Sequence, residues 1–229
     1  MLFRSVGRQA LRFNTSGTPN DAFGYQALYA NTTGAGNTAI GYGSLIANTI
    51  GSNNVAVGAG ALATNTVADG NTAVGRLALN KNTTGSPNDA FGFEALFNNT
   101  TGAYNVAIGY KSLFNNTIGS GNAALGYNAL NNNTTGIDNT AVGREALVSN
   151  TIGIENTAVG TYSLYLNTTG SYNTAVGRSA MEKNTANNNT AFGDSALKYN
   201  TTGTPNDAFG YQALTSRSEE HTSELQSHS

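Results

Sequence analysis

The chain has 229 residues, of which 28 are Gly and only 10% are charged, and its formal net charge is −2. That charge gives no basic footprint for nucleic acid and no cationic face for a membrane surface. No apolar run approaches the ~20 residues that span a bilayer, and there is no Cys for a disulfide or thiol site. We therefore expect neither nucleic-acid binding nor membrane insertion in this segment.

A unit of 17 residues repeats through the chain. Units begin at residues 3, 20, 37, 54, 71, 88, 105, 122, 139, 156, 173, 189 and 206, and one residue is missing before Asn189. Positions 1 to 17 are numbered from these starts. A fixed period of this size is the signature of a solenoid, in which each coil packs only on its neighbours. The sequence predicts a parallel β-solenoid, similar to a β-roll, of about 12–13 coils of 17 residues.

Both ends of the chain depart from the repeat. Residues 217–228 resemble the translation of a widely used sequencing adapter, and residues 2–5 resemble the same adapter read from the opposite strand. We expect residues 1–5 and 217–229 to be artefacts, the latter disordered, and residues 6–216 to form the solenoid. The chain would then be an internal fragment of a longer protein.

Within each unit, positions 2–4 predict a very short strand, because β-branched and aromatic residues dominate position 4. Stacked at about 4.8 Å per coil, such strands would form a parallel ladder along the solenoid axis. Gly at position 5 suggests a corner with positive φ or a close backbone approach. Positions 6–11, as in Arg144–Leu147, favour one or two helical turns, and a second short strand is the alternative. The following Asn-Thr-Thr-Gly would act as stop and turn.

The apolar positions define the expected core. Position 4 is always apolar, position 9 is Leu except for Met181, and positions 3 and 8 are small in nearly every unit. We expect the side chains at positions 4 and 9 to be buried along the whole solenoid. The core residues named on this basis are Val57, Leu62, Val74, Leu79, Ile108, Leu113, Val142, Leu147, Val159 and Leu164.

Positions 12 and 13 are Asn and Thr in every unit from Asn14-Thr15 to Asn200-Thr201, and this pair has two interpretations. In the first, which we favour for Asn, the amides stack inside the solenoid, bond from coil to coil and satisfy turn backbone groups. In the second, the two rows face outward and bind something periodic. The expected ladder residues are Asn31, Asn48, Asn65, Asn82, Asn99, Asn116, Asn133, Asn150 and Asn167.

Side chains that carry catalysis are sparse in the repeat. Both His residues, His221 and His228, lie in the tail, and the acids of the repeat are scattered singly at variable positions. Catalysis needs a positioned acid, base or nucleophile with partners, and metal sites need clustered ligands. We therefore predict no catalytic, cofactor-binding or metal site, and a protein that is not an enzyme.

The recurrent Asn-Thr-Ala-Val-Gly-x-x-Ala-Leu, as in Asn71–Leu79 and Asn139–Leu147, resembles the head repeats of YadA-like trimeric autotransporter adhesins. The chain resembles still more closely the Asn-Thr-Thr-Gly repeat regions of phage and bacterial tail-fibre-type proteins. This resemblance implies a β-roll or solenoid stalk, commonly a homotrimer, that displays or forms a surface-adhesion module. It carries over no individual binding residue.

The repeat and the resemblance together predict a non-catalytic structural or adhesive fibre segment that is extracellular, on a cell surface or virion. Its expected partners are identical chains in a homotrimer and a cell-surface glycan or protein receptor. The alternative is an array-type binding surface, such as ice binding through Thr rows at position 13 with frequent Thr at positions 2 and 14.

Overall fold

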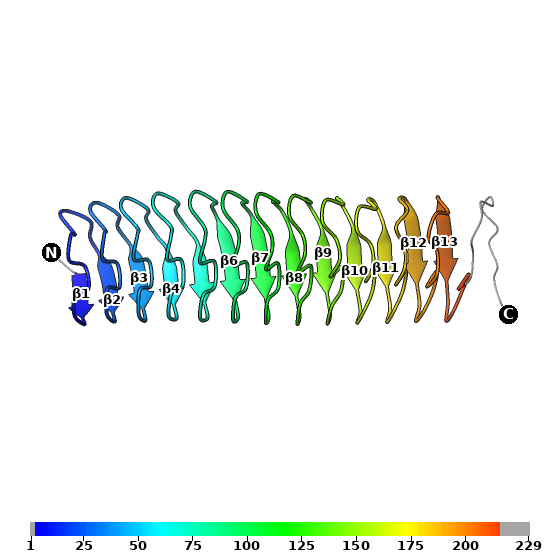
Figure 1. Cartoon of the computed structure of the whole chain (residues 1–229), viewed down its shortest axis with the longest axis horizontal. Helices are drawn as coiled ribbons and strands as arrows, with labels where there is room; N and C mark the ends of the chain where they lie inside the picture. Colours follow the sequence, from blue (N-terminus) through cyan, green and yellow to red (C-terminus); the bar gives the residue numbers. More distant parts are fainter. Residues whose placement is uncertain (1–2, 216–229) are drawn as a thin grey trace.

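The computed structural model describes residues 3–215, which form a single rod (Figure 1). The chain runs from one end of the rod to the other, and each coil contributes one short strand. The strands pair in chain order, all parallel, into one 13-stranded sheet that extends along the rod. The β-solenoid predicted from the repeat is confirmed.

All strands are three or four residues long, because a Gly corner follows each one. They are β1 (Phe3–Val6), β2 (Asn20–Phe23), β3 (Asn37–Ile40), β4 (Val55–Val57), β5 (Thr72–Val74), β6 (Asn88–Phe91), β7 (Asn105–Ile108), β8 (Ala123–Leu125), β9 (Thr140–Val142), β10 (Thr157–Val159), β11 (Thr174–Val176), β12 (Asn189–Phe192) and β13 (Asn206–Phe209).

The strand register follows the repeat. Each residue pairs with the same position of the next coil, so that Thr157 lies beside Thr174 and Ala158 beside Ala175. The register is unchanged across the coil that lacks one residue, where Thr174 pairs with Thr190. The missing residue is therefore accommodated outside the sheet.

Position 4 does not lie in the core, and its predicted burial is wrong. Successive side chains of a strand point to opposite faces, so the inward positions are 1 and 3, and positions 2 and 4 face out. Ala at position 3 is fully buried from coil to coil, whereas Ile108 at position 4 is 39% exposed. The other four position-4 residues expected in the core, Val57, Val74, Val142 and Val159, are only partly buried.

The interior of each coil is built from one large side chain and several small ones. Leu at position 9 packs against Ala at positions 3 and 8 of its own and neighbouring coils. All five Leu residues expected in the core are completely buried, namely Leu62, Leu79, Leu113, Leu147 and Leu164. A coil this narrow has room for one such side chain, so the small residues are needed opposite it.

Positions 6–11 form turns, and neither the favoured helical turn nor a second strand is present within residues 3–215. The residues at positions 7 and 9 have positive φ, for example 55° at Glu145 and 51° at Leu147, which no right-handed helix allows. Their N–H groups bond to other coils instead. Glu145 N donates to Tyr127 O at 2.9 Å and Leu147 N donates to Ser163 O at 3.0 Å.

The Gly at position 5 is required by the close stacking of corners. Gly109 has φ 129°, and a Cβ added to it would lie 2.5 Å from the carbonyl oxygen of Gly126 in the next coil. No L side chain fits such a contact with backbone, so the corner can only be Gly.

The solenoid begins earlier than the expected boundary at residue 6, because residues 3–5 belong to β1 and pair with β2. Backbone pairing does not depend on sequence, and one added ion pair supports it: Arg4 Nη2 lies 2.8 Å from Asp21 Oδ2. The hydrogen bonds that the Arg4 guanidinium donates to the Asp21 carboxylate are the main reason why the pKa of Arg4 is raised. Residues 217–229, expected to be an artefact, lie outside the described residues.

Candidate functional site

The position-12 asparagines form a ladder of amides inside the rod. Asn116 Nδ2 donates to Asn99 Oδ1 at 2.9 Å and to Gly119 O of its own turn at 2.9 Å, while its Oδ1 accepts from Asn133 Nδ2 at 2.8 Å. Each amide thus joins three coils and satisfies one turn carbonyl.

All nine asparagines expected in this inner amide ladder are fully buried, and each donates to the preceding member. They are Asn31, Asn48, Asn65, Asn82, Asn99, Asn116, Asn133, Asn150 and Asn167. Their role is structural, since no solvent or ligand reaches them.

A second buried amide ladder, at position 1, was not anticipated. Asn122 Oδ1 accepts from both the backbone N and Nδ2 of Asn139, at 3.0 and 3.1 Å. Asn139 Nδ2 also donates to Gly153 O at 2.8 Å, which closes the coil between its first and fifteenth positions. Position 1 is Asn in every unit after the first, from Asn20 to Asn206, and this recurrence was the signal that could have revealed the ladder.

The inner amide ladder is broken once, at the coil of 16 residues. Within the described residues, Asn167 Oδ1 is buried and has no hydrogen-bond partner. Asn184, which should donate to it, donates to Ala186 O only two residues away instead of three. The missing residue corresponds to position 14, because Ala186 O accepts from Asn173 Nδ2 in the way that position-15 carbonyls do elsewhere.

Thr at position 13 forms a row that is partly buried in most coils. Thr117 Oγ1 donates to Thr134 O at 3.0 Å, and Thr134 Oγ1 donates to Thr151 O at 3.0 Å. The hydroxyl proton is therefore used by the next coil, which fixes the Thr rotamer. The hydroxyl oxygen keeps its lone pairs for other donors.

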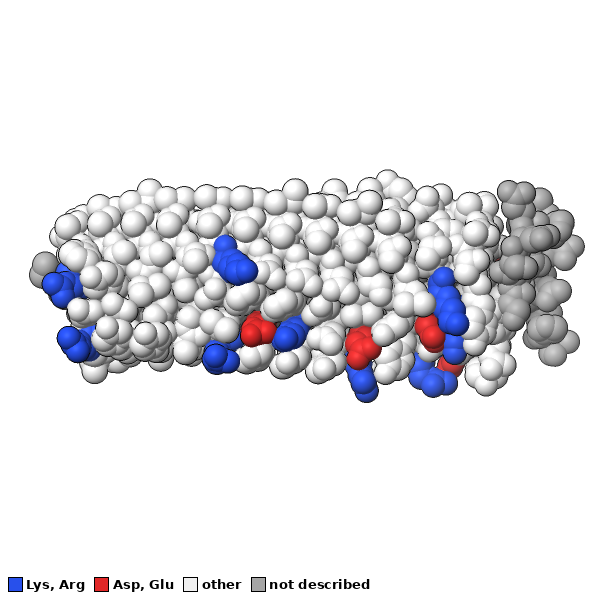
Figure 2. Space-filling view, in the orientation of Figure 1, with Lys and Arg blue, Asp and Glu red and all other residues white. Residues whose placement is uncertain are grey.

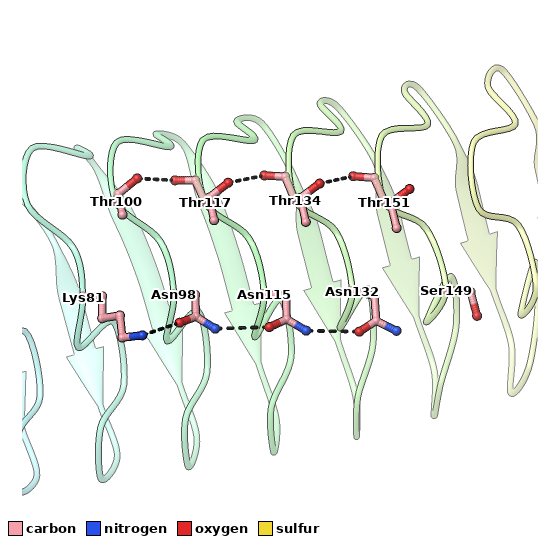
Figure 3. Close-up of a pocket in the computed structure, with 9 residues that line it drawn as sticks. All are labelled: Lys81, Asn98, Thr100, Asn115, Thr117, Asn132, Thr134, Ser149 and Thr151. Carbon is pink, nitrogen blue, oxygen red and sulfur yellow. Dashed lines mark hydrogen bonds between the residues drawn. The ribbon is translucent and has the colours of Figure 1, made fainter.

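A shallow groove of about 640 Å³ lies beside this Thr row (Figure 3). Its other rim is an outer amide row, Asn98, Asn115 and Asn132, at coil position 11. Asn98 donates to Asn115 and Asn115 to Asn132, each at 3.1 Å, and Lys81 Nζ donates to Asn98 Oδ1 at 2.9 Å. The two polar rows run parallel over several coils (Figure 3).

Aromatic and cationic side chains stack in a second row, at position 6. The rings of Phe93, Tyr110 and Tyr127 are stacked with centroids 5.4 and 5.2 Å apart. Arg76 lies 5.6 Å from the Phe93 ring and Arg144 lies 5.8 Å from the Tyr127 ring, so the stack ends in a cation on both sides. Such contacts are worth about 0.5–1.5 kcal/mol each and strengthen coil stacking.

The outer face of the sheet carries an apolar row at position 4. Phe91, Ile108 and Leu125 are 39%, 39% and 46% exposed in consecutive coils. Phe192 and Phe209 stack on this face with ring centroids 5.4 Å apart. This sheet-face row continues over the whole rod, and a continuous exposed apolar surface usually marks an interface.

Charges are few and pair mostly between adjacent coils. In Figure 2 most of them lie in the lower half of the rod, and its upper edge is free of them in this view. Lys111 pairs with Glu94 at 3.3 Å and Arg178 with Asp194 at 3.0 Å. Hydrogen bonds from Ser195 and then Arg178 hold the pKa of Asp194 below its ordinary value. These exposed pairs contribute little to stability.

Residues 3–215 contain no group of three or more His, Cys, Asp or Glu that could hold a metal ion. Nor does this part of the chain contain a helix that could cross a membrane. Comparisons of the chain with family models, curated proteins and solved structures found no match.

Proposed function

We propose that this chain is a non-catalytic structural and adhesive segment of an extracellular fibre, on a cell surface or a virion, and that it assembles as a homotrimer. The observation that carries the proposal is the sheet-face row on an otherwise regular rod. A rod whose buried polar atoms are paired through repeating amide ladders is suited to bearing load and spanning distance.

The occupant we propose for the sheet-face row is a second copy of the chain. A copy has the same axial repeat, so its own row can interdigitate at every coil without loss of register. The row combines β-branched residues with Phe91 and Leu125, and the neighbouring position-2 residues are uncharged in most coils. An apolar surface of this kind is stabilised by leaving water, at about 25 cal/mol per Å² buried. The location outside the cell rests on the resemblance to adhesin and tail-fibre repeats.

Mass measurement by light scattering tests the assembly. The chain is fused to a trimeric coiled coil and compared with the unfused chain for mass and thermal stability. Fusion is expected to raise the melting temperature, and Ile108→Lys with Leu125→Lys is expected to remove that gain. The matched control is Thr101→Lys, at an exposed residue outside the sheet-face row. A stable monomer that gains nothing from fusion would reject the trimer.

Ice binding is a second candidate function, and the surface next to the Thr row favours it. Position 14 is exposed and almost always β-branched, as in Thr84, Thr101, Ile118 and Thr135. Such residues are stiff at χ1, so they present methyl and hydroxyl groups at one fixed spacing. Thermal hysteresis measures this directly. Activity that Ile118→Lys abolishes would support ice binding, and its absence from the folded chain would reject it.

A further inference from the structure

The outer amide row is not required by the fold. Position 11 varies freely along the chain and holds Ala30, Leu166 and Tyr199 in other coils. At this variable position, three consecutive coils carry Asn, and these side chains form one rim of the groove in Figure 3. The other rim is the Thr row. The groove therefore occupies a defined stretch of the rod and is not a property of every coil.

The two rims offer complementary hydrogen-bonding groups. Each amide of Asn98 and Asn115 uses one N–H for the next Asn, and within the described residues its second N–H has no partner. The hydroxyl groups of Thr117 and Thr134 already donate hydrogen bonds to carbonyl oxygens of the next coil, so toward a ligand their oxygens can only accept. A ligand between the rims must accept on one side and donate on the other at every coil. Hydroxyl groups do both.

We propose that this groove binds a linear β-1,4-linked glycan, lying along the rod with about one sugar per coil. The proposal deepens the adhesive role proposed above and rests on it. Coils are spaced about 4.7–4.9 Å apart, as neighbouring strands are. The covalent geometry of a β-1,4-linked pyranose chain makes it advance by slightly more than one such spacing per sugar. An extended peptide advances about 3.3 Å per residue and falls out of register with the coils.

The charge of the groove fits the same ligand. Lys81 is the only ionisable side chain among its lining residues, and its Nζ also lies 5.0 Å from the Phe97 ring centroid. One cation cannot neutralise a chain with a phosphate on every unit, which argues against nucleic acid. It can pair with a carboxylate on a sugar near that end of the groove. Lys81 thus sets a preference among glycans and does not provide the binding itself.

Isothermal titration of the full chain tests the proposal with two probes, cellohexaose and a cellohexaose in which one terminal unit is glucuronate. Both are expected to bind. The triple variant Asn98→Ala, Asn115→Ala and Asn132→Ala removes the donor rim and should weaken both by about tenfold or more. Lys81→Ala should weaken only the probe that carries the terminal carboxylate. The matched control is Lys183→Ala, a position-11 cation outside the groove, which should leave both affinities unchanged.

The proposal is overturned if the folded chain binds neither probe, or if the triple variant binds as tightly as the original. Because the altered side chains lie on the surface, circular dichroism and the melting temperature should match the original and exclude misfolding. The trimer is judged by mass without any glycan. If no glycan binds but the chain is a trimer, only the glycan-binding proposal is rejected. If glycan binds but the chain stays monomeric, only the proposed trimer is rejected.

Discussion

Asn115 and Asn116 are neighbours with the same side chain and opposite surroundings. Asn116 is completely buried in the inner amide ladder, while Asn115 belongs to the outer amide row. The sequence could predict the ladder at position 12, because Asn recurs there directly before a turn whose backbone groups need hydrogen-bond partners. It could not show that position 11 forms a second polar row, because that row exists in only three coils.

Replacing each of these two residues by Ala should separate their roles. Asn116→Ala leaves Asn99 Oδ1 without its donor and removes an acceptor from Asn133, so the free energy of unfolding should fall by about 2–5 kcal/mol. Asn115→Ala should change it by less than about 0.5 kcal/mol. Urea unfolding of the two variants is the measurement. Equal losses would contradict the assignment of one buried and one surface amide row.

At the scale of the single coil, the short strand and its Gly corner could be predicted, whereas the direction of the strand's side chains was misjudged. Apolar composition at position 4 indicated burial, yet the strand alternates and Ala at position 3 takes the inward place. The helical turn failed for a related reason. Propensity favoured it, but bonds such as Leu147 N to Ser163 O run between coils and replace those of a helix.

Leu113 and Ile108 provide the corresponding test of the coil. Leu113→Ala empties the one large core site of its coil and should lower the free energy of unfolding by about 2–5 kcal/mol. Ile108→Ala alters a side chain that is 39% exposed and should cost less than about 1 kcal/mol in the monomer. Thermal or urea unfolding at low concentration decides between them. A larger loss in the free energy of unfolding for Ile108→Ala than for Leu113→Ala would instead support a core at position 4, as the sequence predicts.

At the scale of the whole molecule, stability is a sum of coil terms and contacts between neighbouring coils. The contact between the coils of Asn167 and Asn184 is the weak one, because a buried carbonyl oxygen lacks its donor there. The deletion was visible in the sequence. Its effect was not, since only the geometry shows that position 14 is the residue removed.

Inserting one Thr between Thr185 and Ala186 should repair this contact. The insertion restores the 17-residue spacing, lets Asn184 donate to Asn167, and should add about 1–3 kcal/mol. Hydrogen exchange should show slower opening of the coils after residue 184 than in the original chain. The control is the same insertion between Thr151 and Ile152, in an intact coil, which should destabilise. A repaired chain with unchanged exchange would show that the break carries no energetic cost.

The hydrogen bonds to and from the buried Asn side chains all run in one direction, so the two ends of the rod differ. In both buried ladders the donor belongs to the later coil and the acceptor to the earlier one, as with Asn139 on Asn122 and Asn116 on Asn99. A coil that follows another in either ladder must therefore present its side-chain amide N–H groups to the amide oxygens of the coil before it. All coils of such a rod must have the same orientation, and two rods can stack end to end only head to tail.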